Sequence, residues 1–178
     1  MRIGITGAQS VGKTTLLNAL RSEPFFNGYS VCDEVTRELI DMGFDINEAG
    51  SDITQTLIMQ KHIANIYMND KMLTDRTSLD GLVYTTYLNL HSKVDLVTVE
   101  KAKAIYDKTI HEYDHLFYIR PEFDLVDDGV KKYIRDYGGS KGMFSKRDKI
   151  EVAKEFADEF EEIYKNKEYD FMEAYDIW

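Results

Sequence analysis

Residues 7–14 read GAQSVGKT, and this stretch restricts the possible fold more than any other part of the chain. It matches the pattern G-x-x-x-x-G-K-[ST] at every fixed position. The apolar residues 1–6 precede it, and residues 14–21 follow with apolar side chains at helical spacing. In that context the backbone N–H groups of the turn surround a phosphate group, and the helix N-terminus adds a favourable dipole. The sequence therefore predicts a strand, a phosphate-binding loop and a helix.

The loop also predicts which side chains contact a nucleotide. Lys13 is expected to reach the β- and γ-phosphates of ATP, and Thr14 to ligate Mg²⁺ through its hydroxyl. Mg²⁺ usually needs a further carboxylate, and Asp75 is the first candidate because it ends a predicted strand. The alternative for Asp75 is an N-cap before a helix that begins near Thr77. The predicted nucleotide-binding residues are Gly7, Ala8, Gln9, Ser10, Val11, Gly12, Lys13, Thr14 and Thr15.

Periodicity of apolar side chains predicts the other elements. The predicted strands are residues 1–6, 29–34, 71–77, 115–119 and 169–175. The predicted helices are residues 14–21, 35–42, 52–69, 79–90, 97–111 and 150–164. Helices between strands indicate an α/β fold with a mostly parallel sheet, in which ligands bind beyond the carboxyl ends of the strands. In the helix 52–69 the apolar positions at helical spacing are Ile53, Leu57, Ile63, Ile66 and Tyr67.

Composition limits the class of protein. The chain has 178 residues, 43% of them apolar, so we expect one domain over residues 1–178. No apolar run approaches 18 residues, no leader peptide is evident and Cys32 is the only cysteine, so we expect a cytoplasmic protein with no membrane partner. The net charge of −10 argues against strong nucleic-acid binding, although residues 131–149 form a basic segment.

Charged residues after the predicted strands are candidates for the binding of a phosphoryl acceptor. Glu34 could accept a proton from an acceptor hydroxyl or orient it, and Arg37 follows three residues later. An ordinary surface pair of Glu34 and Arg37 is the alternative. Arg76 could bind an anionic group of the acceptor. Asp33 is the fourth candidate for the binding of the acceptor. Asp33 and Glu34 are also secondary candidates for the metal carboxylate.

Histidine and tyrosine residues carry weaker signals. The four histidines show no metal-ligand spacing and are expected to be structural or surface residues: His62, His91, His111 and His115. Three tyrosines at helical spacing are expected in the core, although one of them could line an acceptor pocket: Tyr67, Tyr84 and Tyr87.

A basic segment with glycines, residues 127–139, is typical of a lid that closes over a triphosphate. We place this lid at about residues 122–148, with Arg135 as the first candidate for a phosphate contact and Lys131 and Arg147 next. A solvated surface loop is the alternative. A GTPase is not indicated, because the nearest match to Asn-Lys-x-Asp, residues 166–170, has its aspartate one position too far along the chain.

The order of these motifs resembles a known group of proteins. GAQSVGKT, DEVTREL (33–39), LTDRTSLDGLVY (73–84), YDHLFYI (113–119) and DDGVKKYIRD (127–136) are similar to the small P-loop kinases that include the ribosylnicotinamide kinase domain of bacterial NAD-metabolism regulators. Phage-encoded kinase-like ATPases belong to the same group. The resemblance covers residues 1–175. It implies a five-stranded parallel sheet in the order 2-3-1-4-5, with ATP and Mg²⁺ as cofactors.

The same resemblance implies transfer of a phosphoryl group to a nucleoside- or nucleotide-like acceptor. By position, Lys13 and Thr14 serve the phosphates and metal, Asp75 serves the metal or the acceptor, and Arg135 belongs to the lid. Glu34 and Arg37 lie by the acceptor. Lys131 stands where the group commonly has arginine, and lysine cannot make the same bidentate contact with phosphate.

The leading hypothesis is an ATP- and Mg²⁺-dependent kinase that acts on a hydroxyl or phosphate of a nucleoside-, nucleotide- or nucleobase-type acceptor. Two alternatives remain open. In the first, a phage DNA kinase in the host cytoplasm phosphorylates 5-hydroxymethyluracil in DNA. In the second, a nucleotide-dependent switch ATPase acts through a protein partner.

Overall fold

The computed structural model describes residues 1–8, 11–33, 35–119 and 172–173. Within these residues the predicted strands and helices are all present, with ends that differ by a few residues. The strands are β1 (Arg2–Thr6), β2 (Ser30–Cys32), β3 (Met72–Asp75), β4 (His115–Tyr118) and β5 (Met172–Glu173). The helices are α1 (Lys13–Arg21), α2 (Val35–Asp41), α3 (Asp52–Met68), α4 (Ser78–Leu90) and α5 (Leu96–Thr109). Short 3-10 turns are formed by Pro24–Phe26, Asn47–Ala49 and Ile110–Glu112.

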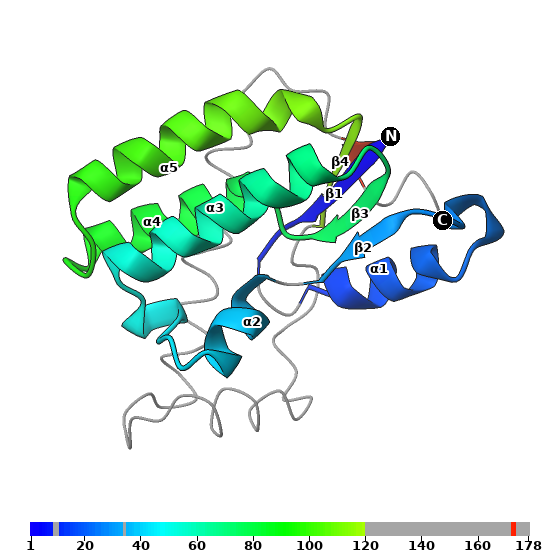
Figure 1. Cartoon of the computed structure of the whole chain (residues 1–178). Helices are drawn as coiled ribbons and strands as arrows, with labels where there is room; N and C mark the ends of the chain where they lie inside the picture. The colour runs from blue at the N-terminus through cyan, green and yellow to red at the C-terminus, as the bar shows by residue number, and fades with distance from the viewer. Residues whose placement is uncertain (9–10, 34, 120–171, 174–178) are drawn as a thin grey trace.

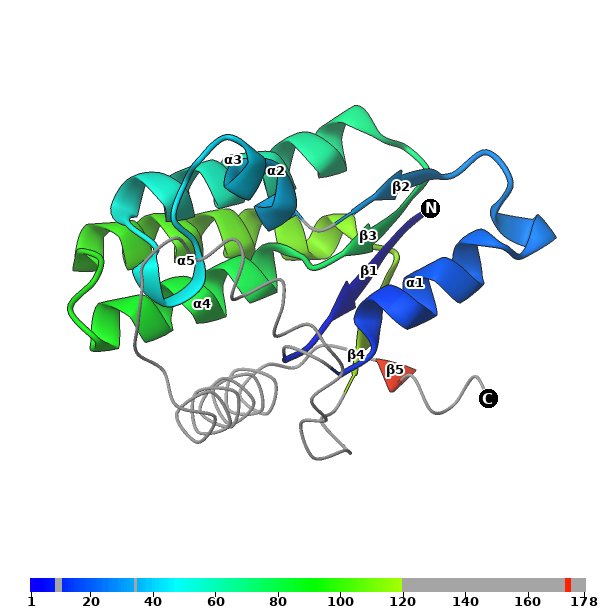
Figure 2. The same ribbon diagram turned by 90° about the horizontal axis from the view of Figure 1, so that it is seen from below.

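The strands form one sheet in the order β2-β3-β1-β4-β5, and every neighbouring pair is parallel. This confirms the predicted α/β fold and the predicted strand order. Helix α1 lies on one side of the sheet, and α3, α4 and α5 lie together on the other side (Figures 1 and 2). The carboxyl ends of the parallel strands therefore meet at one edge, where the chain leaves β1 for residues 7–12.

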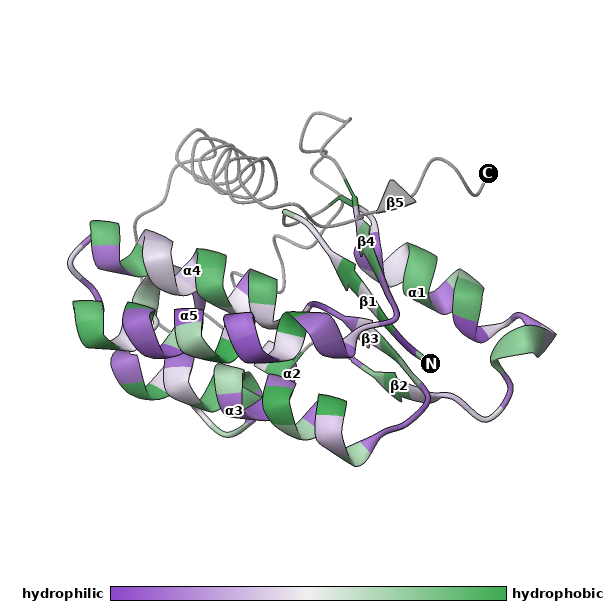
Figure 3. Ribbon diagram, turned by 90° about the horizontal axis from the view of Figure 1, so that it is seen from above, coloured by the Kyte–Doolittle hydropathy of each residue, from purple (hydrophilic) through white to green (hydrophobic). Residues whose placement is uncertain are grey.

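Residues of the central strand β1 alternate between the two sides of the sheet. Ile3 and Ile5 pack with Leu17 of α1 in one hydrophobic cluster. Gly4 and Thr6 face the opposite side, where a Cβ on Gly4 would lie 2.7 Å from the side chain of Thr77 and Thr6 bonds to Asp80 of α4. The colouring in Figure 3 shows the hydrophobic strands between helices that are only partly hydrophobic.

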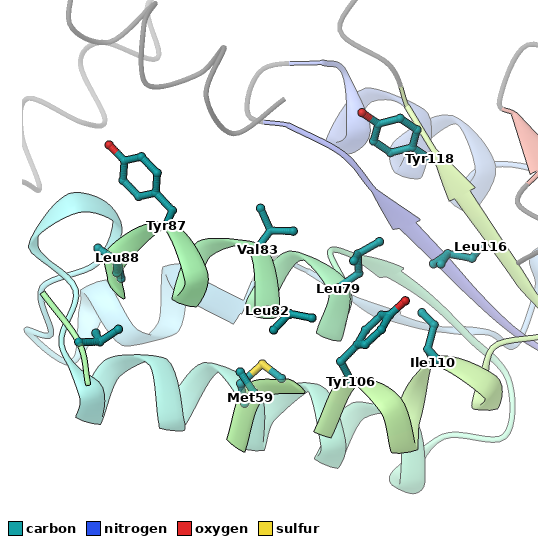
Figure 4. Packing of buried hydrophobic residues seen from close by; sticks show 12 residues of the cluster. Met59, Leu79, Leu82, Val83, Tyr87, Leu88, Tyr106, Ile110, Leu116 and Tyr118 are labelled. Carbon is teal, nitrogen blue, oxygen red and sulfur yellow. The ribbon is translucent and has the colours of Figure 1, made fainter. Parts of the chain in front are cut away.

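The second cluster joins α3, α4 and α5 to the sheet. Leu79, Leu82 and Val83 of α4 belong to one hydrophobic cluster with Tyr106 of α5 and Leu116 of β4, and Figure 4 shows the side chains of this cluster. A buried leucine or tyrosine removes enough apolar surface to contribute about 2 kcal/mol or more. This cluster fixes α4, and with it the residues at the start of α4 that matter below.

The buried face of α3 differs from the predicted one. Ile53 is 66% exposed and Tyr67 is 57% exposed, so both point to solvent. The buried residues of α3 are Thr54, Gln55, Ile58, Met59, His62 and Ile66. Half of the residues on that face are polar. Apolar periodicity alone therefore predicted the wrong face of α3 to be buried. Ser51 caps α3 by accepting a hydrogen bond from the Thr54 N–H (3.3 Å).

Candidate active site

The loop after β1 depends on two glycines with positive φ. Gly7 has φ 140° and Gly12 has φ 92°, backbone conformations that favour glycine. A Cβ on Gly7 would lie 2.5 Å from the backbone oxygen of Ile119, so the end of β4 approaches this glycine closely. A Cβ on Gly12 would meet no atom within 4 Å. The first glycine is thus required by contact as well as by conformation, and the second by conformation alone.

The side chain of Lys13 lies buried inside this loop. Its Nζ donates hydrogen bonds to the backbone oxygens of Gly7 (2.8 Å) and Ala8. The ammonium group is therefore held by two carbonyl oxygens at the point where the loop turns. Of the other predicted loop residues, Val11 and Thr14 are half-buried and Thr15 is exposed. Gln9 and Ser10 lie outside the described residues.

Thr14 and Asp75 meet across the sheet edge. The Thr14 hydroxyl donates a hydrogen bond of 2.6 Å to Oδ2 of Asp75, whose side chain is buried. Asp75 reaches this place because it ends β3 in register with Ile5 of β1. A hydroxyl and a carboxylate are hard oxygen donors of the kind that Mg²⁺ prefers, and Mg²⁺ commonly takes only a few protein ligands beside phosphates and waters. These two residues therefore fit a magnesium ion.

The N-cap alternative for Asp75 is wrong. Thr77 is the N-cap of α4, and its side chain accepts a hydrogen bond from the Leu79 N–H. Asp80 completes a capping box, because its Oδ2 accepts a hydrogen bond of 2.8 Å from the Thr77 N–H. The start of α4 is thus satisfied without Asp75, which leaves that carboxylate on the loop side.

Asp80 also joins two parts of the site. Its Oδ2 accepts a hydrogen bond of 2.8 Å from Thr6, the last residue of β1, and its Oδ1 lies 3.3 Å from Nη1 of Arg76. Arg76 has φ 76°, a left-handed conformation that costs a non-glycine residue about 1–2 kcal/mol. Its guanidinium lies 5.2 Å from the ring centroid of Tyr84, within cation–π range. The ion pair with Asp80 and the Tyr84 ring hold the Arg76 side chain in place.

A pocket opens beside Arg76, between α3 and α4, and we call it the α3–α4 pocket. Its lining residues come from α2, α3, the end of β3, α4 and the turn before α3. They are Val35, Thr36, Asn47, Gln55, Ile58, His62, Arg76, Asp80, Gly81 and Tyr84. Arg76 follows Asp75 directly in the chain, so the wall of the pocket continues into the residues that fit a metal ion.

Two polar side chains of α3 are buried at this pocket. The Gln55 oxygen accepts a hydrogen bond of 3.1 Å from the Thr85 hydroxyl. Burial, and after it the positive charge of Arg76, lowers the pKa of His62 to about 4. His62 is therefore a neutral imidazole at physiological pH. Gly81 allows α3 and α4 to approach closely here, since a Cβ at that position would lie 2.3 Å from the Met59 sulfur.

The structure brings together some of the predicted site residues and separates others. Lys13, Thr14, Asp75 and Arg76 lie around one edge of the sheet, as the positions of their elements predicted. Asp33 is exposed after β2, and Arg37 is exposed on α2 and does not line the α3–α4 pocket. Glu34 lies outside the described residues, and the two residues that follow it line the pocket.

Several predicted features fall outside the described residues. They include the lid at about 122–148 with Lys131, Arg135 and Arg147, the helix over 150–164 and the string at 166–170. Among the described residues, no group of three or more His, Cys, Asp or Glu side chains is placed to hold a metal ion. No helix in the described part of the chain combines the length and hydrophobicity needed to cross a membrane.

Sequence reasoning missed three residues of the site. Asp80 carried a detectable signal, since T-x-x-D before an apolar run is a capping-box pattern. Gln55 and His62 are seven residues apart on one helix, so they share a face, but no motif marks them. Tyr84 is the tyrosine that lines the pocket, whereas Tyr87 lies in the core and Tyr67 is exposed.

A loop of this sequence after β1, at the edge of a 2-3-1-4-5 parallel sheet, defines a P-loop protein of the nucleotide-kinase fold type. A family model described as an AAA domain matches residues 2–175, and the chain belongs to that family. A comparison with curated proteins found no match.

Solved structures share the fold. Deoxyadenosine kinase from M. mycoides, with products dCMP and a flexible dCDP bound, has 19% identity and a TM-score of 0.69, over 97% of this chain and 87% of that one. The NadR protein in complex with NR has 16% identity and a TM-score of 0.57, over 92% and 40%. The YorR protein from Bacillus subtilis, in complex with phosphorylated GDP, has 16% identity and a TM-score of 0.55, over 97% and 84%. At these identities the likeness concerns the fold.

Proposed function

We propose that this protein is an ATP- and Mg²⁺-dependent kinase. It transfers the γ-phosphoryl group of ATP to a hydroxyl or phosphate of a nucleoside- or nucleotide-type acceptor. The observation that carries the proposal is the continuity of the site: the hydrogen-bonded pair of Thr14 and Asp75 adjoins Arg76, which forms a wall of the α3–α4 pocket. A donor site and a partly polar pocket thus share one sheet edge, the usual place for ligands in such folds.

The chain's own residues would bind and orient the triphosphate. Lys13 would exchange the carbonyl oxygens of Gly7 and Ala8 for phosphate oxygens, which is a short movement for its terminal ammonium. Thr14 and Asp75 would hold the magnesium ion. The bound Mg²⁺ would offset the negative charge of the phosphates. Such fixed charges stabilise the transition state more than the ground state, because they are placed where charge develops.

The acceptor would occupy the α3–α4 pocket with its reacting group toward Arg76. The ion pair with Asp80 orients the Arg76 guanidinium. Glu34 stays the proposed base or positioning carboxylate, since Val35 and Thr36 line the pocket immediately after it. Arg135 stays the proposed lid cation. The nucleotides bound in two of the neighbouring structures, which are dCMP and dCDP in one and phosphorylated GDP in the other, support this acceptor class.

Transfer from γ-labelled ATP tests the proposal. The acceptor panel holds deoxynucleosides, ribonucleosides, their monophosphates, nicotinamide riboside, and duplex DNA with and without 5-hydroxymethyluracil. We expect label on a small molecule, with none in the Lys13→Ala variant. If only the modified DNA carries label, the acceptor is a base in DNA and not a small molecule. Acceptor-independent release of labelled phosphate by the wild type, with no labelled product, would favour a switch ATPase and contradict the kinase proposal.

A further inference from the structure

Two polar side chains, together with Ile58, form the α3 wall of the α3–α4 pocket. Gln55 and His62 are 1% and 2% exposed, and they lie on the same face of the helix, seven residues apart. Both belong to the pocket lining, so their small exposed areas lie at the pocket and not at the outer surface. The opposite wall carries the Arg76–Asp80 ion pair and Tyr84. The pocket thus has a charged side near the phosphate loop and a neutral polar side on α3.

The hydrogen-bonding capacity of His62 is not used by the described part of the protein. Among the described residues, none forms a hydrogen bond with its imidazole nitrogens, whereas Gln55 is bonded to Thr85 through its oxygen. The imidazole nitrogens are not among the described side-chain atoms that are buried without a partner, so they keep some access to the space of the pocket. A ligand in the pocket would supply their hydrogen-bond partner.

The protonation state of His62 suits a neutral partner. Its lowered pKa, about 4, results from burial first and from the charge of Arg76 second. The charged groups that line the pocket with it are Arg76, which follows β3, and Asp80 of α4, and these two form an ion pair. A neutral imidazole offers one N–H donor and one nitrogen acceptor. With the Gln55 amide beside it, this wall matches a planar heterocycle that carries both donors and acceptors.

We propose that His62 is a specificity-determining residue of the acceptor site, and that its imidazole hydrogen-bonds the edge of an uncharged nucleobase. The inference rests on the proposed function, and it specifies the orientation of the acceptor. The base lies against α3 at Gln55 and His62, and the reacting group lies toward Arg76 and Asp75. A purely structural histidine, packed near Gly81 and Met59, is the competing explanation, and a phenylalanine of similar shape would serve that role equally well.

Three variants separate these explanations. His62→Phe removes both ring nitrogens with little change in shape, and His62→Gln retains a neutral donor and acceptor. His115→Phe makes the same chemical change at an exposed residue that starts β4 and is the matched control. The probes are deoxyadenosine, deoxycytidine, deoxyguanosine and thymidine, with 2-deoxyribose as the probe without a base.

The first measurement is steady-state transfer from ATP to each probe. We expect His62→Phe to raise the KM of the accepted nucleoside about ten- to one-hundred-fold, the usual effect of losing one buried hydrogen bond, and to change kcat only a few-fold. His62→Gln should recover part of the loss, and His115→Phe should match the wild type. An unchanged KM in a folded His62→Phe variant would overturn the inference.

The second measurement does not need phosphoryl transfer or a folded phenylalanine variant. In wild-type protein labelled with ¹⁵N-histidine and without ATP, the His62 ring resonances should shift on addition of the accepted nucleoside, and should not shift with 2-deoxyribose. If the nucleoside binds and these resonances move while no transfer occurs, the inference stands and the proposed function fails. If transfer occurs while the resonances stay fixed at saturating nucleoside, the function stands and the inference is overturned. If none of the four nucleosides binds, the inference is overturned, while the transfer assay with the wider acceptor panel decides the proposed function.

Discussion

The phosphate loop and the α3–α4 pocket lie at the same edge of the sheet, but the chain builds them in different ways. The loop is one continuous run of eight residues whose role follows from their order, and its key contacts are to neighbouring backbone atoms. The pocket takes its lining from elements that are far apart in the sequence, between residues 35 and 84. The comparison teaches that a site defined by local backbone geometry is readable from sequence, whereas a site defined by packing is not.

The largest effect is expected on the loop side. Lys13→Ala removes the charge that serves the phosphates, and we expect transfer to fall about a thousandfold or more, in line with the loss of a preorganised transition-state contact. Activity with γ-labelled ATP measures this. Thermal unfolding should show a folded variant, and Lys103→Ala, which breaks a surface pair with Asp107, is the control. Transfer within tenfold of the wild type would remove Lys13 from the site.

The second effect concerns the boundary between the two regions. Asp75→Asn keeps an oxygen that can accept the Thr14 hydrogen bond but removes the charge that fits a metal ion. We expect transfer to fall about a hundredfold and the half-saturating Mg²⁺ concentration to rise. A magnesium titration of activity measures both. Asp107→Asn, a change of the same kind on α5, should leave them unchanged. An unaltered magnesium dependence would show that Asp75 does not serve a metal.

The third effect sharpens the claim that packing defines the pocket. Gly81→Ala places a Cβ 2.3 Å from the Met59 sulfur, and we expect a loss of about 1–3 kcal/mol in the free energy of unfolding. For a chain of this size that corresponds to about 2–4 °C in Tm per kcal/mol.

A Met59→Ala background is the control for this variant, because it makes room for the new methyl group. In that background Gly81→Ala should cost less, and the higher helix propensity of alanine could make it neutral. Equal costs in both backgrounds would show that the close approach of α3 and α4 at Gly81 does not limit stability.

The smallest effect is the pH dependence that His62 contributes. Its pKa is about 4 in the folded chain and near 6.5 in the unfolded one, so the unfolded chain binds the extra proton between these values. Stability should therefore fall as the pH drops below about 6.5, with a slope that approaches 1.4 kcal/mol per pH unit for this group. Chemical unfolding of the wild type and of His62→Phe at pH 7 and pH 5 measures it. The difference in stability between the two proteins should change with pH in this direction, and a constant difference would contradict it.

Local signals account for the parts that sequence predicted correctly. The parallel sheet and the position of Lys13 in the loop follow from one motif and from the alternation of strands and helices, whereas the strand order came from the resemblance to the small P-loop kinases. The proximity of Thr14 and Asp75 follows from the rule that the carboxyl ends of parallel strands meet at one edge of the sheet. The rotation of α3 did not follow, because Ile53 and Tyr67 are exposed while Gln55 and His62 are buried. Where polar residues of a buried helix face line a pocket, they interrupt the apolar periodicity by which a buried face is recognised in a sequence.

The most direct test of the account is whether one ligand can occupy both regions at once. The ligands are adenosine linked through five phosphates to each common deoxynucleoside, and binding is measured by calorimetry with Mg²⁺. If the loop and the α3–α4 pocket form one continuous donor and acceptor site, at least one of these ligands binds about a hundredfold or more tightly than ATP. The gain should disappear in both Lys13→Ala and His62→Phe. If every linked ligand binds no more tightly than ATP, the two regions do not form one kinase site, and the account is wrong.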